Sequence, residues 1–309
     1  MQNTKLENRK LHVQSFFHKH AGHFMIYLLL IGIAYIFIYP LMIMFAQSIQ
    51  NVFDQINPMV NWFPEEVYWE NYRRALSAMG GQSTYISSLI NIGIIAIVQT
   101  ATSALIGYSL GKFEFWWTKL ALGIIVVMFI IPREIFLLPQ YLTMSRVGLL
   151  GSLNPVLILS ATGQGISNAI YILIFYSFFR LQPKSLDEAA YVDGAGHLRT
   201  FWQINVPMAK GAFIVNVILS FVWNWNDTEI NNTFFQGKVT TVQLRLQNFA
   251  ALYERMFPYD MMQSTTLDRF SYGVEMAGAI LAIIPLIVFY FIIQRYIVQG
   301  IEQTGITGE

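Results

Sequence analysis

The sequence contains no cysteine among its 309 residues and is poor in charge, with 12% Asp, Glu, Lys and Arg against 55% hydrophobic residues. The lack of cysteine excludes a disulfide framework, a thiolate metal site and a cysteine nucleophile. Soluble domains average about 25% charged residues, so the low charge excludes an ordinary soluble protein. The net formal charge of +1 leaves no broad basic surface for binding nucleic acid.

The sequence also lacks the motifs of ATP hydrolysis and of catalysis. A phosphate-binding loop requires Gly-x4-Gly-Lys-Ser/Thr, because its backbone N–H groups and its lysine surround the phosphates. The two Gly-Lys pairs, at 111–112 and 237–238, are followed by Phe and Val instead. None of the five histidines belongs to a His-Glu-x-x-His motif or to a nucleophile–base arrangement. We therefore expect no catalytic residues and no metal site on this chain.

Long hydrophobic runs are the main feature that is present. A membrane-spanning helix needs about 20 mostly apolar residues, because its backbone polar groups must be satisfied within the segment itself. The first run is too long for the apolar core of a signal peptide, about 7 to 15 residues, and should remain as an anchor. The sequence predicts an all-α integral membrane protein with six transmembrane helices, at about 24–46, 85–108, 120–138, 155–179, 212–226 and 273–293.

The positions of Lys and Arg predict the orientation, because cytoplasmic flanks carry the excess of positive charge. With the N-terminus inside, eleven Lys and Arg fall on the inner side and eight on the outer side. No internal repeat divides the chain. We expect a cytoplasmic N-terminal segment at 1–23, one transmembrane domain at 24–298 and a cytoplasmic tail at 299–309. The long outer segment at 47–84 contains turn signals and aromatic residues, which predict short interfacial helices.

The segment between the fourth and fifth spans carries the most specific local signals. Pro183 should end the preceding helix, and Ser185 followed by Glu188 has the spacing of a capping box. Gly194 can terminate the new helix. The pattern predicts a short cytoplasmic helix of about two turns. Its alanines would leave a smooth surface, on which the backbone of another protein could approach closely.

This loop resembles the EAA loop of ATP-binding-cassette importer permeases, which has the pattern Glu-Ala-Ala-x3-Gly-x9-Ile-x2-Pro. Its Asp-Gly-Ala variant is similar to that of the carbohydrate-uptake branch, the maltose-type permeases. The six spans and the short N-terminus resemble the smaller of the two permease subunits in such systems. The residues that carry the resemblance are Glu188, Ala189, Ala190, Asp193, Gly194, Ala195, Ile204 and Pro207.

The resemblance implies that the short helix is a coupling helix on a separate ATPase subunit. Glu188 would face a basic residue of that partner, Ala189 and Ala190 would pack against it, and Gly194 would permit the turn. The alternative for Glu188 is a capping role alone. The implied partners are a second permease, two ATP-binding subunits that hold ATP and Mg²⁺, and an extracytoplasmic solute-binding protein. The implied location is a bacterial or archaeal cytoplasmic membrane, with both termini inside.

Amide and aromatic side chains near the spans are candidates for a substrate path, since sugars present hydroxyl groups and C–H faces. Polar side chains at membrane depth are costly unless they face protein or water. For Gln99, Thr100, Thr102 and Ser103, hydrogen bonding between helices is the favoured interpretation. A neutral oligosaccharide is favoured, and an acidic one or another polyol-like solute stays open. The path candidates are Gln164, Asn168, Asn224, Trp225 and Asn226.

Two other classes of protein are alternatives to the importer. An ion-coupled secondary transporter of a small polar solute would want charged residues in mid-span and inverted repeats. An intramembrane enzyme would need a nucleophile–base pair or a His–Asp pair at membrane depth. Neither pattern is evident in the sequence.

Overall fold

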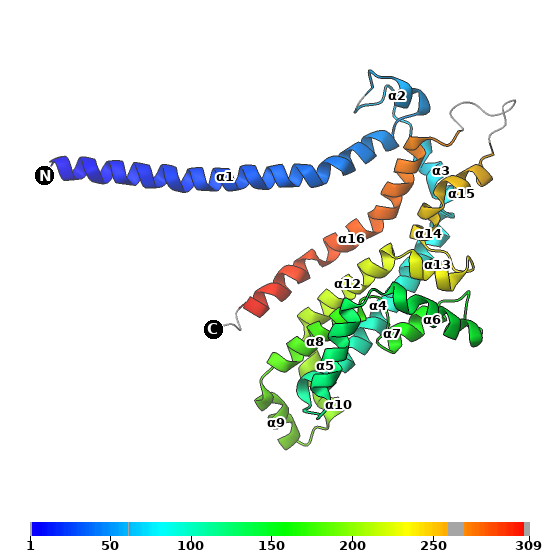
Figure 1. Cartoon of the computed structure of the whole chain (residues 1–309). Helices are drawn as coiled ribbons and strands as arrows, with labels where there is room; N and C mark the ends of the chain where they lie inside the picture. The colour runs from blue at the N-terminus through cyan, green and yellow to red at the C-terminus, as the bar shows by residue number, and fades with distance from the viewer. Residues whose placement is uncertain (1, 61, 259–268, 306–309) are drawn as a thin grey trace. The chain divides into compact units, whose positions relative to one another are not determined.

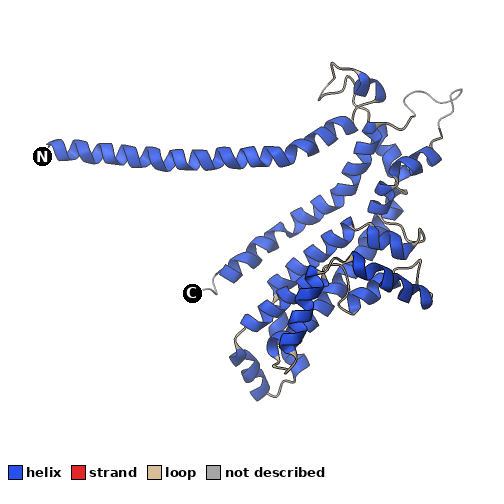
Figure 2. Cartoon of the chain, in the orientation of Figure 1, coloured by secondary structure: helices blue, strands red, loops and turns tan. Residues whose placement is uncertain are grey.

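The computed structural model describes residues 2–60, 62–258 and 269–305, without the side chains of 2–21 and 297–305. The side chains of most of the expected N-terminal segment therefore lie outside the described residues, as do the last four residues of the expected tail. Within these ranges every regular element is a helix (Figure 2). The expected all-α class is confirmed for the part of the chain that the structure describes.

Contacts between residues divide the chain into two compact units. The first contains Met1–Ala75 and Tyr259–Ile280, and the second contains Leu76–Pro258 and Leu281–Glu309. The long helix α16, Tyr272–Gly305, contributes its first turns to one unit and its remainder to the other. The sequence predicts one transmembrane domain at 24–298 and gives no sign of this division.

The first unit consists of α1 (Gln2–Ser48), α2 (Val52–Ile56), the start of α3 (Glu70–Ala78) and the first turns of α16. Hydrogen bonds join the end of α1 to α3: the Ser48 and Tyr72 hydroxyls lie 2.7 Å apart, and Asn71 Nδ2 donates to the Ser48 carbonyl at 2.9 Å. From Phe24 onward, the apolar side chains of α1 are largely exposed. The short helices expected at 47–84 are confirmed as α2 and α3.

The second unit is built around α4 (Gly81–Lys112), against which α7 (Asn154–Ala161), α8 (Asn168–Leu181) and α12 (Lys210–Asn226) pack (Figure 1). Two glycines let α4 and α8 approach closely. A Cβ atom on Gly107 would lie 2.6 Å from Phe175 Cβ, and one on Gly111 would lie 3.0 Å from the Tyr176 carbonyl oxygen. Small residues four apart are typical of close helix packing in membranes.

The remaining helices of this unit are short. They are α5 (Thr118–Ile130), α6 (Glu134–Arg146), α9 (Lys184–Val192), α10 (His197–Thr200), the π-helix η1 (Phe201–Asn205), α11 (Val206–Met208), α13 (Glu229–Phe235), α14 (Val242–Gln247) and α15 (Phe249–Met256). The helices α9 to α11 form the loop between α8 and α12.

Three helical segments are long and apolar enough to cross a membrane: Gly22–Ser48, Gly81–Lys112 and Tyr272–Tyr296. Two bent pairs of helices raise the number to as many as five. The expectation of continuous helices at 120–138 and 155–179 is wrong. The first breaks by 101° between α5 and α6, where Pro132 cannot donate a backbone hydrogen bond. The second breaks between Ala161 and Asn168, where Gly163 has φ of +77°.

Candidate functional site

The helix α9 lies where the sequence predicts a short helix, but its start differs from the expectation. Pro183 occupies the N-cap position, and no side chain caps the helix. Ser185 lies inside the first turn, so the expected capping box with Glu188 is wrong. A residue with helical backbone angles within the first turn does not act as the N-cap. The Glu188 carboxylate therefore does not cap α9.

The C-terminal end of α9 agrees with the expectation. Gly194 has φ of +79°, and its N–H donates to the Tyr191 carbonyl at 3.0 Å. The next N–H, that of Ala195, donates to the Ala190 carbonyl at 2.9 Å. These two bonds form a Schellman motif, in which glycine adopts the left-handed conformation without a Cβ penalty. The predicted helix end at Gly194 is confirmed.

The outer face of α9 is open. Glu188, Ala189, Asp193 and Gly194 are exposed, and Val192 is 88% exposed. Exposed apolar side chains are numerous in this chain, so the open face as a whole is the feature that a partner could contact. Ala190, in contrast, is buried within its own chain, and Ala195 is half-buried. The expectation that Ala190 contacts a partner is therefore corrected, because its side chain packs inside this unit.

A buried ion pair that the sequence analysis missed fixes α9 to α4. Lys112 Nζ lies 2.6 Å from Asp187 Oδ2, and Asp187 Oδ1 accepts a hydrogen bond from Asn205 Nδ2 at 2.9 Å. The pair joins residues 75 positions apart, and no local sequence pattern connects them. The only hint in the sequence was an acidic residue directly before the predicted docking residue Glu188.

Pro207 shapes the connection from this loop to α12. It lies in α11, directly after the π-helix η1, where the Val206 N–H donates to the Phe201 carbonyl. The wider π turn separates the proline ring from the Gln203 carbonyl, with which it would clash in a regular α-helix. A bend of 79° follows between His197–Met208 and Lys210–Asn226. Pro207 thus helps to set the direction in which the backbone enters α12.

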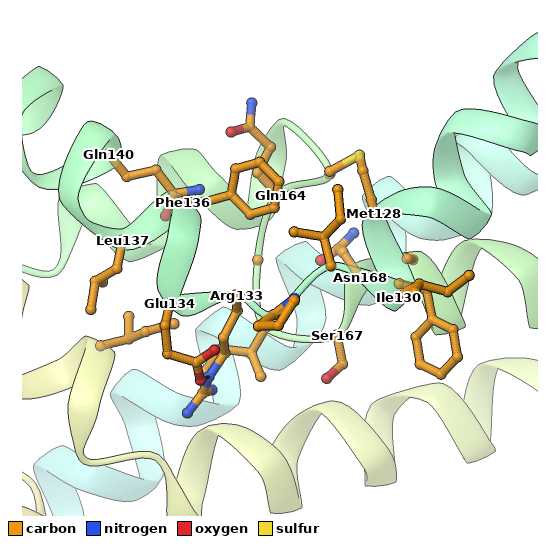
Figure 3. Close-up of a pocket in the computed structure, with 18 of the residues that line it drawn as sticks. Met128, Ile130, Arg133, Glu134, Phe136, Leu137, Gln140, Gln164, Ser167 and Asn168 are labelled. Carbon is orange, nitrogen blue, oxygen red and sulfur yellow. Dashed lines mark ion pairs between the residues drawn. The ribbon is translucent and has the colours of Figure 1, made fainter.

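A pocket of about 430 Å³ opens at the break between α5 and α6 (Figure 3). The other wall is formed by the loop before α8, with Gln164, Ser167 and the start of α8 at Asn168. Arg133 is the one basic residue among the residues that line it. Gln164 is exposed, in agreement with a residue that a small solute could reach.

Acidic groups surround Arg133. Its guanidinium lies 3.0 Å from Asp227, 3.4 Å from Glu229 and 3.6 Å from Glu134. Asp227 is buried, and its Oδ2 accepts the backbone N–H of Ile230 at 3.0 Å. Burial raises the pKa of Asp227 above its usual value, while the Arg133 charge acts in the opposite direction.

A buried polar network centred on Gln99 joins α4, α8 and α12. Ser220 Oγ donates to Gln99 Oε1 at 2.5 Å, and Asn224 Nδ2 donates to the same oxygen at 3.0 Å. On the other side, Asn168 Nδ2 donates to Ser103 Oγ at 3.0 Å. The expected hydrogen bonding between helices is thus confirmed for Gln99 and Ser103.

The network changes the interpretation of three path candidates. Asn168 and Asn224 are buried, and hydrogen-bonding groups of the chain occupy their amide nitrogens. Trp225 is completely buried, and its Nε1 donates to the Ala282 carbonyl at 3.3 Å. Asn224 and Trp225 pack within the protein instead of facing an open path, whereas Asn168 also lines the pocket, and its Oδ1 accepts no hydrogen bond from the described residues. Asn226 is exposed, although its amide also donates to the Val222 carbonyl at 2.9 Å.

The chain is similar to known membrane transport proteins. Residues 103–303 match the model of a family described as the binding-protein-dependent transport system inner membrane component. The chain is 28% identical over 285 residues to the osmoprotective compounds uptake permease protein GgtD of Synechocystis, a match that covers 89% of each chain. It is 27% identical over 285 residues to the maltodextrin transport system permease protein MalD of Streptococcus pneumoniae, covering 91% of this chain and 94% of the relative.

The fold is also similar to that of a solved structure. A chain in the crystal structure of a bacterial ABC transporter involved in the import of the acidic polysaccharide alginate superimposes with a TM-score of 0.67. The two chains are 22% identical, and the match covers 88% of this chain and 95% of the other. At this identity the similarity concerns the fold.

Proposed function

Because the chain belongs to the family of binding-protein-dependent transport system inner membrane components, we propose that it is the permease subunit of an ATP-driven oligosaccharide importer, coupled to its ATPase through α9. The observation that carries this proposal is the exposed face of α9, held between Pro183 and the left-handed Gly194. The exposed carboxylates of Glu188 and Asp193, with the exposed Ala189 between them, support the docking of a partner on this face.

The coupling surface in this proposal combines docking residues with residues that shape the loop. Glu188, Ala189 and Asp193 present the contact face to the ATPase, since all three are exposed. Gly194 ends α9. Three further residues set the shape of the loop from within: Ala190, Ala195 and Pro207.

Six spans accommodate the helices of both units. In this proposal they are α1, α4, the pair α5 and α6, the pair α7 and α8, α12 and α16, within a transmembrane domain at 24–298. The two broken spans place irregular backbone at membrane depth, which is tolerated only where it is buried in protein or lines a water-filled cavity. Both breaks border the pocket at Arg133 and Gln164, in agreement with a polar path there. Both termini lie on the cytoplasmic side.

The assembly contains a second permease subunit, two ATP-binding subunits and an extracytoplasmic solute-binding protein. ATP and Mg²⁺ bind to the ATPase subunits, since the phosphate-binding pattern is missing from this sequence. Binding and hydrolysis of ATP would open and close the ATPase dimer, and α9 would transmit that movement to the spans. This chain contributes binding surface and motion and performs no chemistry.

The pocket favours a neutral cargo on this side of the path. Arg133 is surrounded by three carboxylates, so its charge is already compensated and leaves no cationic site for an acidic sugar. Gln164 offers amide groups for hydroxyl groups of the cargo, and Asn226 offers a second exposed amide. Asn168 lines the same pocket, whereas Asn224 and Trp225 are buried within the unit.

The test is a pull-down of the tagged chain from its native membrane in mild detergent, with Glu188→Arg beside the wild type. The wild type should retain an ATPase chain and a second multispanning chain. Loss of a central docking residue costs about 2 kcal/mol or more, which weakens docking roughly thirtyfold. Glu188→Arg should therefore release the ATPase and keep the second permease.

Glu254→Arg is the matched control, because Glu254 is also an exposed acid on a short helix of the same unit. It should leave the assembly intact. Recovery of the wild-type chain alone, in a stable folded form, would overturn the importer and direct attention to an ion-coupled transporter. Retention of the ATPase by Glu188→Arg would overturn the docking role of α9.

A further inference from the structure

Lys112 and Asp187 form a buried ion pair at the junction of two helices. Lys112 is the last residue of α4, and Asp187 lies in the first turn of α9. Their side chains are only 8% and 11% exposed, and Nζ and Oδ2 lie 2.6 Å apart. Lysine at a helix C-terminus and aspartate in a first turn each complement the local helix dipole. The pair is therefore favourable at both of its ends.

Neighbouring polar groups complete the pair. Lys112 Nζ also donates to the Gln182 carbonyl at 3.5 Å, and the second Asp187 oxygen accepts from Asn205 Nδ2. Gln182 Nε2 in turn donates to the Asn205 carbonyl at 3.2 Å. Burial of a charged pair is costly unless further hydrogen bonds satisfy its donors and acceptors, as they do here. The network joins α4, the start of α9 and the π-helix η1 at one point.

A second ion pair connects the same two regions at the surface. Lys184 Nζ lies 3.1 Å from Glu114 Oε1, but these side chains are 76% and 89% exposed. Exposed pairs of long side chains contribute little, because solvent screens the charges and the side chains lose entropy. The chain thus offers a buried pair between α4 and α9 and an exposed pair between the segment that follows α4 and α9. Of the two pairs, only the buried one is shielded from solvent.

We infer that Lys112 and Asp187 are positioning residues, which make α9 move with α4 as one rigid body. This inference rests on the proposed function, in which α9 receives the movement of the ATPase. The backbone alone would be a weak connection, because α9 is flanked by the extended Gln182–Pro183 segment and by Gly194 and Gly196. A force on Glu188 could then rotate α9 without moving the spans. The buried pair transfers that force directly to α4, the central helix of its unit.

The first measurement is the distance between spin labels on α4 and α9. The chain has no native cysteine, so Leu105→Cys and Val192→Cys place two labels at exposed positions without background. The full-length protein in nanodiscs should give a narrow distance distribution by double electron–electron resonance. Lys112→Met should broaden it, and Lys112→Gln, which keeps a hydrogen-bond donor, should broaden it less.

Charge reversal separates positioning from general destabilisation. Lys112→Asp alone places two carboxylates together and should broaden the distribution. Adding Asp187→Lys restores an ion pair, and the Asn205 amide can rotate to present its oxygen to the ammonium group. The double variant should therefore recover the narrow distribution. Glu114→Gln with Lys184→Met is the matched control and should leave the distribution unchanged.

The second measurement follows coupling in the assembly retained by the tagged chain. Disturbance of a coupling network typically changes the coupling by about twofold to thirtyfold. Lys112→Met should reduce by such a factor the stimulation of ATP hydrolysis by solute-binding protein, with maltodextrin as the probe. The charge-reversed double variant should restore it.

The outcomes separate this inference from the proposed function. If the wild-type chain retains no ATPase, the proposed function fails, while the label distances still report whether the pair fixes α9. If the ATPase is retained but Lys112→Met leaves both the distance distribution and the stimulation unchanged, the positioning role is overturned. Equal broadening by the Glu114 and Lys184 control would overturn it as well.

Discussion

At the scale of single residues, Asp227 is subject to opposing interactions. Burial disfavours its charged form, whereas Arg133 at 3.0 Å and two backbone N–H groups favour it. The net effect is a raised pKa, so the folded protein binds this proton more tightly than the unfolded chain does. Asp227 therefore contributes less to stability as the pH rises above its ordinary titration range.

The variant Asp227→Asn removes this titration and keeps an oxygen that can accept the Ile230 N–H. Because burial raises the pKa of Asp227 and disfavours its charged form, the unfolding midpoint of the variant relative to wild type should rise as the pH increases above about 4. Intrinsic tryptophan fluorescence during thermal unfolding in detergent gives both midpoints. A relative midpoint that falls over this range would show that the ion pair with Arg133 outweighs burial.

Residue-level reasoning also explains the two different outcomes at α9. Gly194 could be predicted as the end of the helix, because its left-handed conformation is a local preference. Ser185 could not be placed from its spacing to Glu188, because the start of α9 is decided by Pro183 and by the Asp187 ion pair. A capping box depends on which residue is the N-cap. Here the N-cap is Pro183, which lies one turn before Asp187 and its ion pair with Lys112.

At the scale of elements, the contact between α4 and α8 depends on the missing side chains of Gly107 and Gly111. A Cβ atom on Gly107 would lie 2.8 Å from the Tyr176 backbone nitrogen, a separation that requires the helices to move apart. Gly93 lies in the same helix with no heavy atom within 4 Å of its Cβ position. The two glycines therefore differ in packing while sharing the same helical backbone.

Gly107→Ala should destabilise the protein by about 1–3 kcal/mol through overpacking. Gly93→Ala should have the opposite sign and stabilise the helix by up to about 1 kcal/mol, since alanine loses less backbone entropy than glycine. Equilibrium unfolding in mixed micelles measures both changes. Equal effects of the two substitutions would show that α4 and α8 do not require close approach at Gly107.

The broken spans are also a property of elements. Hydrophobic content identified apolar stretches at 120–138 and 155–179, but it does not report whether a helix continues through them. Pro132 interrupts the first, and the loop containing Gly163 and Gly165 interrupts the second. A Cβ atom on Gly165 would lie 2.8 Å from Gln99 Nε2, so the loop is fitted against the polar network of α4. The break between α7 and α8 lies at this contact between Gly165 and Gln99.

At the scale of the whole molecule, the proposed six-span topology places α9 and α15 on opposite sides of the membrane. The native sequence has no cysteine, so single cysteines report on their positions without background. Val192→Cys in α9 and Glu254→Cys in α15 both replace exposed residues. In intact cells a membrane-impermeant maleimide should label position 254 and leave position 192 unlabelled until the membrane is permeabilised. Labelling of both positions in intact cells would contradict the topology.

The sequence by itself determined the class of the protein and located the loop that we propose couples it to an ATPase. Long apolar runs with little charge indicate membrane spans, because a helix satisfies its backbone hydrogen bonds internally and apolar side chains are compatible with hydrocarbon. The positions from Glu188 to Pro207 identified the loop, since their spacing is local and belongs to one continuous stretch of chain. Absence of the phosphate-binding pattern led to the proposal of a separate ATPase.

The tertiary structure alone decided which polar residues face each other. Asn168 bonds to Ser103, Asn224 bonds to Gln99, and Asp187 pairs with Lys112, across separations of 65, 125 and 75 residues. The sequence marked the two asparagines as polar groups near the spans, but a buried polar group can be satisfied by any partner that packing brings within reach. The packing of α8 and α12 on α4 determined which partners these groups found. It also left Gln164 and Asn226 exposed while other candidates became buried.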